Sequence, residues 1–120
     1  MSKTIEEYSL AELMKRIEET LNENSGPIEG VSATYLFDIS GDDGGAWQLH
    51  IKDGSASVKE GADQVDCTLQ MALDVFHQFM QGKLNGTVAF MTGKLKIKGD
   101  IGKALKIESI LRQYDVKEHL

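Results

Sequence analysis

The first strong pattern in the chain is an apolar residue at every third or fourth position, which is typical of one face of a helix. Its members are Leu10, Leu13, Met14, Ile17 and Leu21. Ser9 and Glu12 have the spacing of a capping box, which satisfies the free amides at the start of a helix. The sequence therefore predicts a helix over residues 10–23 with one apolar side, ended by the turn residues 24–27.

From residue 31 the period of the apolar positions changes to two, which is typical of strands with one buried face. Strands are predicted over 31–39, 47–52, 55–60 and 65–71, and a later one over 94–98 whose lysines point outward. Turn residues separate the first three, and the glycine-rich segment 41–45 is expected to be a hairpin loop, because it lacks the Lys-Ser or Lys-Thr of a phosphate-binding loop. The chain thus contains five strands.

Helical spacing returns after the fourth strand. It predicts a helix over 73–80, a very short one over 88–91, and a final one that Asp100 caps and that reaches residue 114. Strands followed by helices favour an α+β domain with a mainly antiparallel five-stranded sheet covered on one face. All of residues 1–120 are expected to form one domain.

Two of these helices carry more apolar surface than a helix lying on a sheet needs. The apolar positions spread over roughly 160° in the 73–80 helix and roughly 220° in the final helix. The 88–91 segment is apolar nearly all round, so we expect it to be buried or to border an apolar space. The surplus must meet a neighbouring helix, a partner chain or a cavity that accepts an apolar guest, and the pattern leaves these three open.

Composition agrees with a folded domain. The apolar fraction is 41%, the charged fraction is 27% and there is one proline. The single Cys67 forms no internal disulfide and residues 1–7 do not form an apolar leader, so an intracellular location is expected. No apolar run approaches the roughly 20 residues that cross a bilayer.

Charge is divided unevenly along the chain. The net charge is −6, which disfavours nucleic acid as a partner. Residues 1–80 carry 5 basic and 15 acidic side chains, whereas residues 81–120 carry 8 basic and 4 acidic ones. The basic third either makes transient contact with anionic headgroups at a membrane surface or is an ordinary solvated face.

Candidate catalytic groups do not form a recognisable constellation. His50, His77 and His119 lack metal-ligand spacing with one another or with Cys67. Cys67 lies on the apolar side of its strand and is expected to be a buried thiol, and His77 is expected to be exposed on its helix. No nucleophile elbow, Walker or dinucleotide-binding pattern occurs. We therefore expect neither enzymatic activity, nor a cofactor, nor a metal.

Residues 37–114 resemble the sterol carrier protein type 2 domain, which occurs in free lipid-transfer proteins and as a module of peroxisomal enzymes. The resemblance is carried by residues 39–49, 66–69, 79–84 and 90–100. The last two segments are specific: an aromatic-containing helix ends in Gly-Lys-Leu, and a short apolar turn leads into Gly-Lys-Leu-Lys-Ile-Lys-Gly-Asp before the last helix.

The resemblance implies a five-stranded sheet covered by about five helices, with an apolar tunnel between them. It implies binding and intracellular transfer of fatty acyl chains, fatty acyl-coenzyme A, sterols or phospholipids. By position, the tunnel wall comprises Trp47, Leu49, Phe76, Phe79, Met80, Val88, Phe90, Met91, Leu105, Ile107, Ile110 and Leu111.

This sequence departs from the family pattern at two places. Peroxisomal relatives end in a Ser-Lys-Leu type of signal, whereas residues 118–120 are Glu-His-Leu, so a cytoplasmic location is expected. Leu105 and Ser109 stand where relatives often have glutamine and methionine, so contacts to a ligand headgroup differ. An interaction module that presents its apolar helix face to a partner chain is the alternative function, and oligomeric state stays open.

Overall fold

The structure, a computed structural model, describes residues 5–61 and 64–114. The order of helices and strands is the predicted one, with two short 3₁₀ turns, Ile5–Glu7 and Gly26–Ile28, in addition. The helices are α1 (Leu10–Glu23), α2 (Leu73–Met80), α3 (Gly86–Met91) and α4 (Ile101–Arg112), and the strands are β1 (Ala33–Ser40), β2 (Gly45–Lys52), β3 (Ser55–Glu60), β4 (Cys67–Ala72) and β5 (Lys96–Gly99). The α+β class is confirmed, with four α-helices in the described residues where about five were expected.

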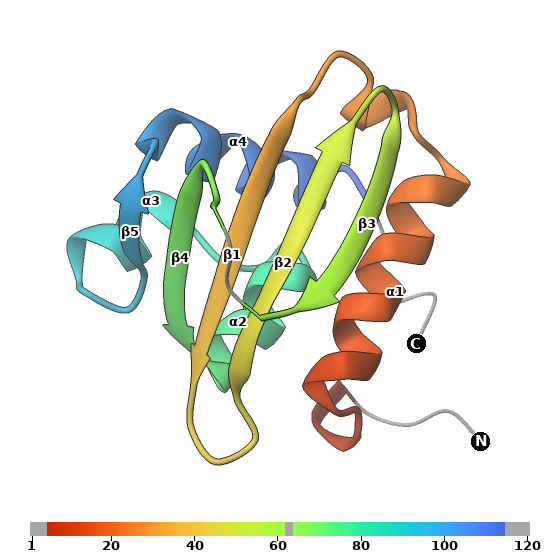
Figure 1. The fold of residues 1–120 in the computed structure, drawn as a ribbon. Helices are drawn as coiled ribbons and strands as arrows, with labels where there is room; N and C mark the ends of the chain where they lie inside the picture. Colours follow the sequence, from red (N-terminus) through yellow and green to blue (C-terminus); the bar gives the residue numbers. More distant parts are fainter. Residues whose placement is uncertain (1–4, 62–63, 115–120) are drawn as a thin grey trace.

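The five strands form one sheet in the order β3-β2-β1-β4-β5 (Figure 1). Three neighbouring pairs are antiparallel, but β1 and β4 are parallel, with Phe37 opposite Leu69. The sheet is therefore mixed. The parallel pair arises because the chain leaves β3 at one edge and passes to the other side of β1, a crossover that alternation along single strands does not reveal.

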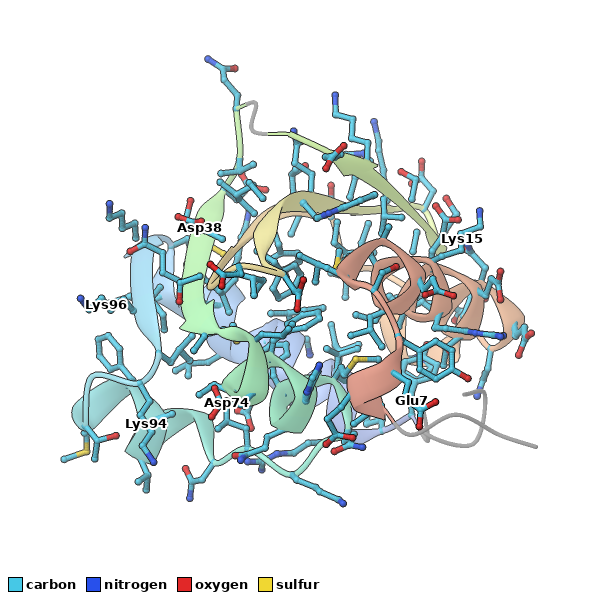
Figure 2. All side chains as sticks on the ribbon, turned by 90° about the horizontal axis from the view of Figure 1, so that it is seen from below. Glu7, Lys15, Asp38, Asp74, Lys94 and Lys96 are labelled. Carbon is cyan, nitrogen blue, oxygen red and sulfur yellow. The ribbon has the colours of Figure 1, made fainter. Side chains whose placement is uncertain are left out.

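One face of the sheet is covered by helices and the other is open. Along β1, Tyr35 and Phe37 are buried whereas Thr34 and Asp38 are only partly so, as the period of two requires. The helix α1 packs on β3 and β2, while α2 and α4 pack on β4 and its neighbours. Figure 2 shows α1 and α2 on the same side of the sheet. The core is the layer between the sheet and the helices.

Both predicted helix caps are present. The Glu12 amide donates to Ser9 Oγ at 3.1 Å and the Ser9 amide donates to Glu12 Oε1 at 2.9 Å, which completes the capping box of α1. The Lys103 amide donates to Asp100 Oδ1 at 3.1 Å at the start of α4. The Tyr114 hydroxyl donates to the Asn24 carbonyl and thereby joins the segment after α4 to the end of α1. The predicted hairpin loop between β1 and β2 is also confirmed.

Candidate ligand-binding site

Seven of the twelve residues predicted to line a tunnel lie together in the core layer. They are Leu49 on β2, Phe76, Phe79 and Met80 on α2, and Ile107, Ile110 and Leu111 on α4, all at most 1% exposed. These side chains belong to one continuous apolar cluster, with Trp47 packed partly buried at its edge. The fold therefore brings together residues that are more than 60 positions apart in the sequence.

The other four predicted lining residues lie at the surface. Val88, Phe90 and Met91 on α3 are 52%, 41% and 79% exposed, and Leu105 on α4 is 38% exposed. The expectation that residues 88–91 are buried or border the apolar space is wrong for these three side chains. Because α3 has only six residues and lies against the core through Gly86 and Ala89, its other side chains point away.

Aromatic side chains fill the centre of the layer. The ring of Phe37 packs edge to face with Phe76 at 5.6 Å and with Phe79 at 5.7 Å between centroids. A ligand that enters here must displace these rings or the helices that carry them, since protein interiors are close-packed. The tunnel that the resemblance implies stays a prediction.

A buried hydroxyl that sequence reasoning missed lies in the same layer. Tyr35 is wholly buried on β1, and its hydroxyl makes no hydrogen bond to any described residue. Burial, Cys67 and the carboxylates of Asp66 and Asp100 raise the pKa of this phenol, so it stays a neutral donor. The inward position of a tyrosine in the alternating pattern of β1 was the available signal, because a buried tyrosine usually has a polar partner.

Cys67 is buried, as predicted, next to this tyrosine in the sheet. Burial and the nearby carboxylates of Asp100 and Asp66 raise the pKa of its thiol to about 11. A neutral buried thiol is a poor nucleophile. The negative charges that raise both pKa values also disfavour an anion at this end of the layer.

The prediction that His77 is exposed is wrong. Only 9% of this residue is exposed, and its Nε2 has no hydrogen-bond partner among the described residues. Its surroundings include Ile5, Leu73 and Gln81, which line the same recess. The turn Ile5–Glu7, which the helical pattern from residue 10 does not include, lies beside α2 and lines this recess through Ile5 and Glu6.

Polar side chains form a second recess outside the layer, at the end of β1 and β4. Asp38, Asp74, Lys94 and Lys96 border it (Figure 2), and Gln70 donates to Asp38 at 2.9 Å. Its charges are mixed, so it does not define a site for one kind of ion.

Over residues 5–61 and 64–114, the structure contains no group of three or more His, Cys, Asp or Glu side chains suited to a metal ion. Within the same ranges no helix combines the length and the apolar character that crossing a membrane requires.

These features define the class of the protein: a small α+β domain whose functional element is an apolar layer between a mixed sheet and its helices. The SCP-2 sterol transfer family matches residues 12–112, and the chain belongs to this family. It is accordingly a lipid-binding and lipid-transfer domain.

Solved structures of sterol carrier proteins have the same fold. The sterol carrier protein domain 2 of Helicoverpa armigera is 30% identical and superimposes with a TM-score of 0.72 over 94% of this chain and 93% of that one. The apo form of sterol carrier protein 2 from Yarrowia lipolytica is 28% identical, with a TM-score of 0.72 over 96% of this chain and 98% of that one.

The expectation that the protein is not an enzyme is contradicted by its curated relatives, which are named hydroxysteroid dehydrogenase-like protein 2. The human protein is 41% identical over 92 residues, which are 75% of this chain but 22% of that protein. The Xenopus tropicalis protein is 38% identical over 118 residues, which are 97% of this chain and 28% of that protein. The chain spans about a quarter of the length of these relatives, so the catalytic motifs that its residues lack can lie in the remaining part of such proteins.

Proposed function

We propose that this domain binds a single-chain acyl lipid with an uncharged polar end, one molecule per domain, and carries it between sites. The observation that supports this ligand is the continuous apolar layer formed by β1, β2, α2 and α4, into which β1 brings the unpartnered hydroxyl of Tyr35. The other buried hydroxyl without a partner among the described residues, that of Thr20, lies on α1. A linear chain can thread between side chains that change rotamer, whereas a rigid ring system requires a larger space at once. The nearby carboxylates favour a neutral polar end over an anionic one.

Transfer of the chain out of water supplies the affinity. Each buried methylene contributes about 0.8 kcal/mol, so a chain of about 16 carbons contributes on the order of 12 kcal/mol. The loss of translational freedom and the displacement of core side chains reduce this value. An affinity of about 1 μM, which corresponds to about 8 kcal/mol, is consistent with these terms.

The first test is binding of a fluorescent acyl probe to the delipidated protein, followed by displacement with hexadecanol, with palmitate and with a sterol. We expect one probe per chain, a dissociation constant near micromolar, and displacement that is strongest with the alcohol. Native mass spectrometry of the protein before delipidation identifies any lipid that co-purifies. The proposal is contradicted if no lipid co-purifies and the probe does not bind. If the sterol binds more tightly than hexadecanol and palmitate, the ligand class is a sterol and not an acyl lipid.

Replacing Tyr35 by phenylalanine is expected to weaken binding of hexadecanol about fivefold, because one neutral hydrogen bond contributes about 1 kcal/mol. The same change is expected to leave the stability of the ligand-free protein unchanged or to raise it, since the hydroxyl is buried without a partner. Fluorescence displacement measures the first effect and urea unfolding measures the second.

Tyr114→Phe is the matched control, because it removes a hydroxyl that donates to the Asn24 carbonyl. This variant is expected to lose about 1 kcal/mol of stability and to keep the affinity of the wild type. An equal loss of stability in both variants means that the Tyr35 hydroxyl has a partner in the ligand-free protein, and its role as a ligand contact is then wrong.

A further inference from the structure

Five large apolar side chains are exposed on two neighbouring helices. They are Val88, Phe90 and Met91 on α3 and Ile101 and Leu105 on α4, and we call them the α3–α4 surface. Within the described residues, every large apolar side chain that is exposed belongs to this group. Scattered exposed apolar residues are normal on a protein surface, but their restriction to one pair of elements indicates a contact surface.

The start of α3 packs against Glu108 of α4, which is three residues after Leu105 and therefore on the same face of α4. A Cβ added to Gly86, the first residue of α3, would lie 2.9 Å from Glu108 Oε2 on α4, which shows how closely the helices approach. Ile101 and Leu105 are four residues apart and therefore lie on one face of α4. Val88 and Met91 are three residues apart on α3 and follow the same rule.

The segment that carries this surface is rich in lysine in an otherwise acidic protein. Residues 83–106 contain six lysines and one acidic residue, Asp100, whereas the whole chain has a net charge of −6. Among the described residues only Lys103 of these six forms a salt bridge, with Asp66 at 3.6 Å. Lys94 lies three residues after the end of α3, and Lys106 is exposed beside Leu105 on α4. Lys96 and Lys98 extend from β5 toward the open face of the sheet, so Lys94 and Lys106 are, within the described part of the chain, the exposed, unbridged lysines nearest in sequence to the apolar residues.

We propose that the α3–α4 surface docks the domain on a lipid bilayer that contains anionic headgroups. Apolar side chains that enter the headgroup region and lysines that attract anionic lipids are the two components of peripheral membrane binding. A second copy of the chain is disfavoured as the occupant, because a symmetric contact places the lysines of both copies opposite one another. Docking requires no bound acyl lipid, so it is measured on the delipidated protein.

The test is co-sedimentation with phosphatidylcholine vesicles, with and without phosphatidylglycerol. We expect binding that requires the anionic lipid and weakens steeply with added salt, since the Debye length falls from about 30 Å at 0.01 M to about 8 Å at 0.15 M. Equal binding to both kinds of vesicle, or no binding to either, overturns the proposal.

Two variants test separately the apolar side chains and the lysines of the docking surface. Val88→Ser with Met91→Ser is expected to lower vesicle partitioning at least about tenfold, because each apolar side chain that enters the membrane contributes more than 1 kcal/mol. Lys94→Gln with Lys106→Gln is expected to lower it about tenfold or more and to reduce its salt dependence, at about 1 kcal/mol per lysine. All four side chains are exposed, so both variants are expected to fold.

Lys15→Gln with Lys52→Gln is the charge-matched control. Lys15 lies on α1, on the opposite side of the domain from Lys94 (Figure 2), and Lys52 ends β2. This pair is expected to change vesicle binding less than twofold. If both lysine pairs lower vesicle binding equally, binding depends on the net charge of the protein and not on the α3–α4 surface, and the proposal is overturned. Sedimentation velocity supplies a second check: self-association that the Val88 and Met91 substitutions abolish assigns the surface to a second copy of the chain instead.

Discussion

Phe79→Ala is expected to lower the free energy of unfolding by about 3–5 kcal/mol, the range for a buried phenylalanine replaced by alanine. The ring of Phe79 is 1% exposed and packs edge to face against Phe37 between α2 and β1. Its loss removes buried apolar area and leaves a cavity that the surrounding core closes only in part. Urea unfolding followed by circular dichroism measures the change.

The same substitution distinguishes a ligand site from an ordinary core. If the acyl chain occupies the layer where this ring lies, it fills the new cavity, and saturating hexadecanol restores stability in proportion to its affinity. Binding to the variant is then at least as tight as to the wild type. A variant that loses stability and gains nothing from the ligand shows that the chain binds elsewhere.

Phe90→Ala on α3 is the control within the same chain, since this ring is exposed. Its removal is expected to cost less than about 0.5 kcal/mol, as for other surface substitutions. A loss as large as that of Phe79→Ala means that α3 contributes to the core, and the assignment of its apolar residues to a docking surface is then wrong.

Local patterns were sufficient to predict the elements of this fold. The helix α1 begins and ends as predicted because its apolar period, its capping box and the turn after it all agree. The strand β3 and the helix α2 also have their predicted bounds, and Asp100 caps α4. These properties depend on residues close together in the sequence.

Properties that depend on distant contacts were not predictable in the same way. The parallel pairing of β1 with β4 follows from the path of the chain after β3, which no single strand encodes. A turn some 70 residues earlier lies beside the buried His77, and short-range periodicity carries no record of that neighbour. Exposure of Val88 and Met91 likewise depends on which side of α3 meets α4.

In the candidate site, too, local patterns predict some properties and miss others. Residues on the apolar faces of helices, such as Phe76 and Ile107, are buried in the layer between sheet and helices. Whether they line a ligand space is a prediction, since the layer is filled by side chains. The hydroxyl of Tyr35 was missed because the pattern that reveals a buried position treats tyrosine as one more apolar residue.

Gly99→Ala is expected to destabilise the domain by about 3 kcal/mol or more. Gly99 ends β5 with φ at +90°, a conformation that costs other residues about 1–2 kcal/mol. A Cβ there would also lie 2.6 Å from the Asp66 carbonyl oxygen and 3.1 Å from Cys67 Cα, where β5 pairs with β4. Backbone atoms cannot move aside as a flexible side chain can, so β5 must shift.

The displacement is expected to reach the ligand layer through the next residue. Asp100 caps α4, and its amide donates to the Asp66 carbonyl at 3.1 Å, so moving Gly99 disturbs the anchor of that helix. Hydrogen exchange is expected to show faster opening in β5 and in the first turn of α4 than in β1 and β2.

Gly93→Ala separates the cost of the positive φ from the cost of the clash with the backbone of β4. Gly93 has φ at +80°, but a Cβ added there meets no atom within 4 Å, so this variant carries the backbone strain without the clash. Its expected cost is about 1–2 kcal/mol, with hydrogen exchange in α4 unchanged. Equal losses in both variants mean that strain accounts for the whole effect and that the close approach of β5 to β4 does not position α4 over the acyl-binding layer.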